Sequence, residues 1–89
     1  MTAPLFPFNP ALNRRFRLQW EDTQQCHVLL YPEGMVRLNG SAGAILERCD
    51  GVASVDQIVL ALEARFHTGG LRPDIENLLA HAYRQHWIV

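Results

Sequence analysis

The stretch from residue 28 to residue 46 constrains the fold more than any other part of the chain. Residues 28–31 are a β-branched and apolar run, which is followed by the turn sequence Pro32-Glu33-Gly34. Proline presets φ at the first central position of a turn, and glycine can take a positive φ after it. Residues 35–38 are predicted to form a second short strand, after which Asn39 or Ser41 can cap a helix that begins near Ala42. The stretch therefore predicts a β-hairpin that leads directly into a helix.

Two further patterns extend this hairpin to a three-stranded sheet. In residues 16–20, apolar and polar side chains alternate, which is typical of a strand with one buried face. In residues 25–31, both faces are largely apolar, so we expect this strand to be central and covered on both sides. The strand at 35–38 would then lie at the edge of an antiparallel meander.

The apolar periodicity changes from 2 to 3.6 after residue 41 and predicts three helices. The first helix is expected to end at Asp50-Gly51, the second to begin at Ser54 in a capping box with Gln57, and the third to begin at Pro73. Their predicted buried positions are Ala42, Ile45, Leu46 and Cys49, then Val55, Ile58, Val59, Leu62 and Phe66, then Ile75, Leu78, Leu79, Ala82, Tyr83 and His86. Residues 14–89 thus form a single α+β, winged-helix-like domain, with a three-stranded antiparallel sheet followed by a three-helix bundle.

Residues 1–13 are predicted to form an extended arm, because three prolines interrupt them. The arm also carries Leu5, Phe6 and Phe8, which is more apolar surface than a plain solvated tail would need. It can cover the domain's own core, dock on a second copy in a homodimer, or remain a mobile terminus.

The composition narrows the class of protein. The chain has 89 residues and a net charge of −1 from eight arginines, no lysine and nine acidic residues, a balance that argues against binding nucleic acid or a membrane surface. There is no secretory signal and no apolar segment of about 20 residues, so we expect a cytoplasmic protein. Cys26 and Cys49 lie in apolar patterns and are interpreted as reduced, buried thiols.

The polar residues give no sign of catalysis. Ser41 and Ser54 stand at helix starts, where capping explains them. His81 and His86 are five residues apart, which is a poor spacing for a metal pair on one helix face. No Ser-His-Asp pattern and no phosphate-binding loop occurs. The sequence therefore predicts a protein that is not an enzyme and holds no metal or cofactor.

Binding is the function class that remains. The edge strand at 35–38 presents unpaired backbone groups, to which an extended peptide can add as a further strand. The alternative is a winged-helix DNA-binding regulator, since the helix-turn-helix proportions fit. Against it, Asp56 places a carboxylate in the first turn of the second helix, where a phosphate would approach. A third hypothesis is a structural dimer module that exchanges the arm between copies.

Several sequence segments together resemble a known family. They are Phe16-Arg17-Leu18-Gln19-Trp20-Glu21, Val28-Leu29-Leu30-Tyr31-Pro32-Glu33-Gly34, Leu38-Asn39-Gly40-Ser41-Ala42, Ile45-Leu46, Cys49-Asp50-Gly51, Asp74-Ile75 and Trp87-Ile88. In this order they resemble the pyrroloquinoline quinone biosynthesis protein D (PqqD) family over residues 12–89. The resemblance implies a peptide chaperone without enzymatic activity. It would bind the ribosomal precursor peptide of the cofactor and present it to a radical S-adenosylmethionine enzyme.

The resemblance also implies a site, because the leader peptide in this family adds beside the third strand and packs against the third helix. The corresponding residues are Met35, Val36, Arg37 and Leu38 on one wall, and Asp74, Ile75, Leu78, Leu79, Ala82 and Tyr83 on the other. Arg37 and Arg84 are then candidates for contacts with acidic side chains of the peptide. The chain departs from the family pattern at His86, where glycine is usual, and at Leu78-Leu79, where Phe-Leu is common.

Overall fold

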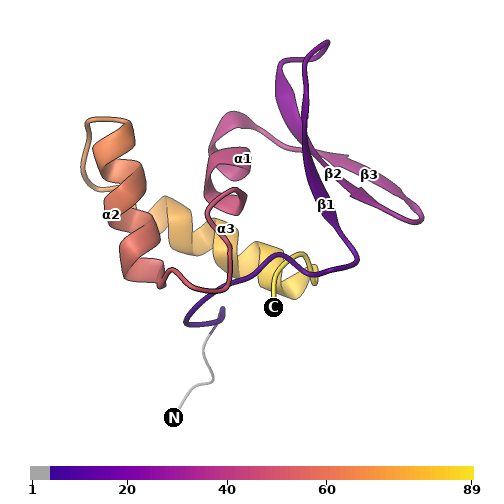
Figure 1. Ribbon diagram of the computed structural model, residues 1–89. Coiled ribbons are helices and arrows are strands. Elements are labelled where there is room, and N and C mark those ends of the chain that lie inside the picture. Colours follow the sequence, from indigo (N-terminus) through magenta and orange to yellow (C-terminus); the bar gives the residue numbers. More distant parts are fainter. Residues whose placement is uncertain (1–4) are drawn as a thin grey trace.

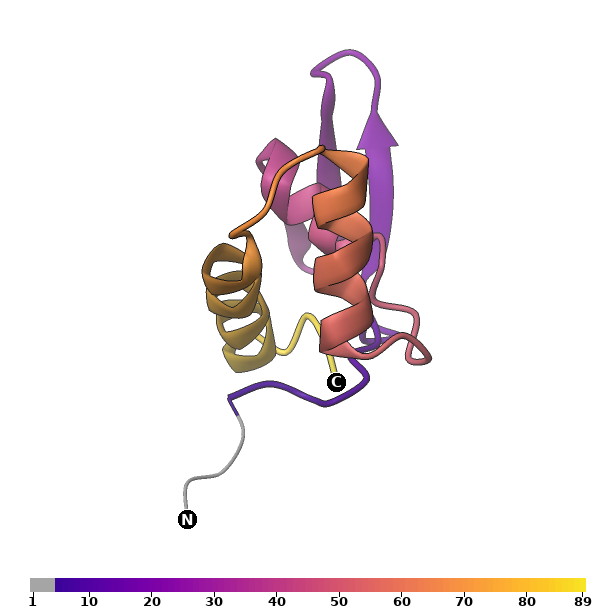
Figure 2. The same ribbon diagram turned by 90° about the vertical axis from the view of Figure 1, so that its left-hand side faces the viewer.

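The computed structural model describes residues 5–89, in which a sheet precedes three helices along the chain (Figure 1). The elements are β1 (Arg17–Glu21), β2 (Cys26–Tyr31), β3 (Gly34–Arg37), α1 (Gly40–Leu46), α2 (Val55–Arg65) and α3 (Arg72–Arg84). The strands form one antiparallel sheet of order β1-β2-β3, so the α+β fold with a central second strand is confirmed. The helices lie on one side of the sheet in Figure 1, and they stand in front of it in Figure 2, which is the view from that side.

The register of the sheet decides which side chains face the helices. Leu29 lies opposite Leu18 on one side and Val36 on the other, so these three side chains share the inner face. Leu29 is completely buried and belongs to the main hydrophobic core, together with residues from all three helices. Tyr31 pairs with Gly34, so the loop between β2 and β3 has only two residues, Pro32 and Glu33.

Helix α1 begins at Gly40, two residues before the predicted start near Ala42, and it ends earlier than predicted. The Asn39 side chain accepts a hydrogen bond of 2.7 Å from the N–H of Ala42 and caps the helix. The predicted end at Asp50-Gly51 was wrong, because the helix stops at Leu46. Beyond it, the N–H groups of Arg48 and Cys49 donate to carbonyls three residues back, which tightens the chain into turns.

One close approach fixes α1 against the sheet. A Cβ atom on Gly43 would lie 2.4 Å from Nδ1 of His27 on β2, so only glycine fits there. The His27 Nε2 atom lies 3.4 Å from a carboxylate oxygen of Glu47, just after the helix. This contact holds the start of β2 beside α1.

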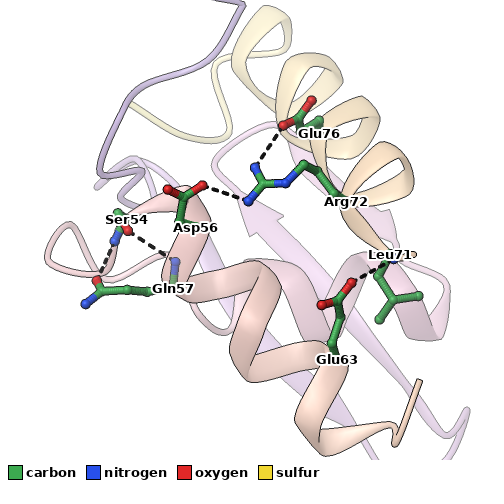
Figure 3. Close-up of polar contacts among 7 residues, drawn as sticks. All are labelled: Ser54, Asp56, Gln57, Glu63, Leu71, Arg72 and Glu76. Atoms are coloured by element: carbon green, nitrogen blue, oxygen red, sulfur yellow. Dashed lines mark hydrogen bonds and ion pairs between the residues drawn. The ribbon is translucent and has the colours of Figure 1, made fainter. Parts of the chain in front are cut away.

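Helix α2 carries the predicted capping box (Figure 3). The Ser54 N–H donates to the Gln57 side chain at 2.8 Å, and the Gln57 N–H donates to the Ser54 hydroxyl at 3.1 Å. Its predicted buried stripe holds except at Phe66, which is 50% exposed. Phe66 follows the last helical residue, so it no longer points to the core with the stripe.

Helix α3 is held at its start by side chains of α2 and of its own first turn (Figure 3). The Leu71 N–H donates to a carboxylate oxygen of Glu63 at 3.1 Å. The guanidinium of Arg72 bonds Asp56 at 2.7 Å and Glu76 at 3.1 Å. These contacts replace the side-chain cap that Leu71 lacks.

The predicted stripe of α3 is correct in its middle and wrong at its end. Ile75, Leu79 and Ala82 are buried, whereas Tyr83 is 44% exposed and His86 is exposed. The helix ends at Arg84, and His86 then takes a left-handed φ of +63°. This backbone reversal turns the chain back, so that the C-terminal segment returns along the core.

Residues 5–13 run past the helices to the sheet (Figure 1), and within this segment Phe6 and Leu12 pack on the main core while Leu5 and Phe8 are exposed. Ala11 and Val89 exchange two backbone hydrogen bonds of 3.1 and 2.8 Å, and the N–H of Leu12 donates to the carbonyl of Cys49 at 3.1 Å. Pro10 is fully buried, and Leu12 packs on the main core. The arm segment thus lies between the C-terminal residues and the loop after α1.

Candidate functional site

The third strand forms one open edge of the sheet. The N–H of Leu38 donates to the carbonyl of His27 at 3.0 Å, and these two residues continue the register between β2 and β3. In an antiparallel pair, hydrogen-bonded positions alternate with positions whose backbone groups point away. The N–H and C=O groups of Val36 and Leu38 therefore face β2, while those of Met35 and Arg37 face outward. Within residues 5–89, Met35 and Arg37 form no backbone hydrogen bond outside the sheet.

The side chains of β3 divide between the two faces of the sheet. Leu38 is 5% exposed and belongs to the core, and Val36 packs at the border of the core with part of its surface open. Met35 is 53% exposed and Arg37 is exposed, both on the face away from the helices. Of the four residues predicted on this wall, Leu38 can therefore offer no accessible side chain.

The predicted wall on α3 is mostly core. Ile75, Leu79 and Ala82 have at most 2% of their surface exposed, so a ligand cannot reach these side chains without moving others. Leu78 packs on the core with part of its surface open, and Tyr83 is 44% exposed in the last turn. Arg84 is also exposed there.

Asp74 lies at the other end of α3. It lines a mainly apolar hollow of about 200 Å³ with α1, α2 and the loop between α2 and α3. The lining residues are Ser41, Ala44, Ile45, Leu62, Phe66, Leu71, Asp74 and Ile75. None of them comes from the sheet, so Asp74 and the edge of β3 do not share one hollow.

Cys49 and Asp50, whose pKa values are shifted, both have a structural role. Burial raises the pKa of the Cys49 thiol to about 12, so this group stays protonated and unreactive at neutral pH. The N–H groups of Ala53 and Val52 donate to the Asp50 carboxylate and lower its pKa. Asp50 therefore stabilises the turn between α1 and α2. Both cysteines are free, as predicted, but only Cys49 is buried, whereas Cys26 is partly exposed. No cluster of three or more potential metal ligands occurs among residues 5–89.

The surface of α2 gives the DNA-binding alternative no support. Asp56 occupies the first turn and is paired with Arg72, while Leu60 is 66% exposed further along the helix. A helix that enters the major groove needs donors for base edges and phosphates at these positions. In residues 5–89, moreover, no helix has the length and apolar character that crossing a membrane requires.

The outward direction of the Met35 and Arg37 backbone was not predicted. The sequence suggested a three-residue turn of Pro32, Glu33 and Gly34, whereas the loop has two residues. In a two-residue hairpin the flanking residues form a hydrogen-bonded pair, so the next residue along each strand points outward. The loop length was therefore the signal that identifies the free donors of this edge.

The fold and the edge define the class of protein first: a small α+β domain whose sheet ends in a strand to which an extended chain can add. A family model described as coenzyme PQQ synthesis protein D (PqqD) matches residues 26–88. A PqqA binding protein of Azotobacter vinelandii is 52% identical, with 89% of this chain and 87% of that protein covered. One from Pseudomonas paraeruginosa is 51% identical, with 99% and 97% covered. The chain therefore belongs to the PqqD family.

A solved structure agrees with this assignment. It is the solution NMR structure of the PqqD truncation of Methylobacterium extorquens PqqCD, described as a functional and stand-alone RiPP recognition element. It superposes with a TM-score of 0.78 at 30% identity, and the match covers 94% of each chain. The order of sheet and helices is thus that of a known recognition element.

Proposed function

We propose that this chain binds PqqA, the precursor peptide of pyrroloquinoline quinone, by adding it as a strand to the free edge of β3. The observation that carries the proposal is the outward direction of the Met35 and Arg37 backbone groups. Its second support is the relatives at about half identity, which are named for binding PqqA and match nearly the whole chain.

The contacts of the added strand follow from the register of β3. Its backbone would bond the N–H and C=O groups of Met35 and Arg37. Its side chains on the inner face would reach the open surface of Val36, and Leu78 and Tyr83 are the accessible candidates on α3. Those on the outer face would lie beside Met35 and Arg37, where a carboxylate suits the guanidinium. Ile75, Leu79 and Ala82 support this wall from inside the core rather than contact the peptide.

The role that follows is that of an adaptor rather than an enzyme. The bound peptide would be presented to the radical S-adenosylmethionine enzyme of the same pathway, which supplies the chemistry. The domain itself needs no cofactor, since binding by strand addition uses only backbone groups and apolar surface. We place this binding in the cytoplasm, where a ribosomal peptide is made.

A proline at an outward position tests the edge directly. Arg37→Pro removes the outward N–H and leaves the hydrogen bonds to β2 in place, which an edge strand tolerates. Losing one peptide hydrogen bond and stranding its acceptor should weaken PqqA binding about tenfold or more. Arg37→Ala keeps the N–H and should cost less than about threefold, because an exposed ion pair adds little. Isothermal titration calorimetry with synthetic PqqA measures both.

The opposite edge of the sheet provides the matched control. The backbone groups of Cys26, Val28 and Leu30 face β1, so on β1 those of Trp20 point away from the sheet. Trp20→Pro should therefore leave the PqqA affinity unchanged, with the fold checked by circular dichroism. If folded Arg37→Pro binds PqqA as tightly as the wild type, β3 is not the docking edge.

A further inference from the structure

Half of the arginines of the chain lie on or next to the outer face of the sheet, which the helices do not cover. Arg17 on β1 lies opposite Leu30, and Arg37 on β3 lies opposite Val28, so both side chains are on this face. Arg14 and Arg15 directly precede β1 and line a shallow hollow of about 350 Å³ with Arg17 and Leu30. We call Arg14, Arg15, Arg17 and Arg37 the arginine face.

Most of this positive charge has no ion-pair partner among residues 5–89. Arg15 lies 3.6 Å from Glu33, and both side chains are largely exposed. In the part of the chain that the structure describes, the other three members of the arginine face form no ion pair within 4 Å. All four side chains are exposed. The face can therefore form new charge-assisted contacts without breaking more than one weak pair.

The chemistry of the face favours a protein over a nucleic acid. Arginine and methionine are enriched in protein interfaces, and lysine is depleted there. Here Met35 is 53% exposed beside Arg37, Leu30 is partly open between the strands, and the chain has no lysine. A surface that tracks phosphates would show charge without these apolar side chains and without Glu33 at its border. Guanidinium groups can bind carboxylates in a bidentate manner, so the fitting partner surface is acidic.

We propose that the arginine face docks an acidic surface of the radical S-adenosylmethionine enzyme that modifies the peptide. This inference rests on the proposed function. Because Arg37 belongs both to this face and to the edge strand, an enzyme seated there lies directly beside a peptide added to β3. The enzyme would use Arg14, Arg15 and Arg17 on the β1 side of the face, away from the peptide edge, so both partners can be bound at once.

Charge reversal away from the peptide edge tests the proposal. Arg14→Glu/Arg17→Glu changes the β1 side of the face and leaves β3 untouched. Association of the PqqA-loaded protein with the purified enzyme is measured by biolayer interferometry at low and raised salt. The variant should lose about tenfold in association rate at low salt, and its remaining rate should depend less on salt. Arg48→Glu/Arg65→Glu, with the same charge change on the helix side, should stay within about twofold of the wild type.

The outcomes separate this inference from the proposed function. Calorimetry with PqqA alone should give the same affinity for the wild type and Arg14→Glu/Arg17→Glu. If the wild-type protein does not bind PqqA in this measurement, the proposed function itself is refuted. An enzyme association rate equal to the wild type would overturn the docking surface. So would arginine-dependent binding of duplex DNA or anionic vesicles with unchanged enzyme association. Arg17→Ala serves as the milder variant if the double reversal fails to fold.

Discussion

His86 is the residue whose backbone is least suited to its side chain. Its φ of +63° lies in the left-handed region, and its carbonyl accepts a hydrogen bond of 2.8 Å from the Asn13 side chain. A residue with a Cβ atom pays roughly 1–2 kcal/mol in this conformation, while glycine costs about 0.5–1 kcal/mol more in unfolded-chain entropy. A non-glycine residue at this position therefore carries a cost in folding free energy.

His86→Gly should stabilise the protein by about 0.5–1 kcal/mol, because it relieves the left-handed strain. Urea unfolding followed by circular dichroism measures the free energy of unfolding. The matched control is Gln85→Gly, where φ is −85° and glycine only adds freedom to the unfolded chain, so stability should fall. Equal effects of the two glycines would show that the backbone conformation of His86 is not the cause.

At the scale of elements, α3 depends on α2 for its start. Leu71 precedes α3 in an α-helical conformation without a side-chain cap, and its N–H is bonded by Glu63, eight residues earlier. Glu63→Ala should cost about 1 kcal/mol of stability, as the loss of an N-cap does. Glu63→Gln keeps an acceptor and should cost less than half as much. Amide hydrogen exchange at Leu71 locates the effect, and unchanged protection in Glu63→Ala would contradict this role.

The strands and helices follow from local patterns, whereas their ends do not. The capping box at Ser54 and the cap at Asn39 were correct because both depend on residues within three positions. The predicted end of α1 was wrong: the chain leaves the helix after Leu46, and the carbonyl of Cys49 then accepts from the N–H of Leu12, which is far away in the sequence. The cap from Glu63 was missed for the same reason. Contacts between distant segments leave no local pattern to read.

The candidate site shows the same division. Periodicity predicted the strand at 35–38 and the third helix as elements, but it assigns Ile75, Leu79 and Ala82 to one stripe without separating core from wall. Whether the odd-numbered or the even-numbered residues of β3 bond to β2 depends on the length of the hairpin loop. One residue more or less in the loop exchanges the bonded and the free backbone groups of β3. The accessible part of the predicted site is therefore smaller than the set of residues that sequence reasoning proposed.

At the scale of the whole molecule, residues 5–13 decide whether a monomer can cover its own hydrophobic core or needs a second copy to do so. Leu12 packs on the chain's own core, whereas Phe8 is 78% exposed. Leu12→Ala should destabilise the protein by about 1–2 kcal/mol, less than for a fully buried leucine, and Phe8→Ala should have almost no effect. Because the arm covers its own core, the thermal midpoint should also be the same after about a hundredfold dilution. A midpoint that falls on dilution, with a dimer mass in light scattering, would instead show that the arm is exchanged between two copies.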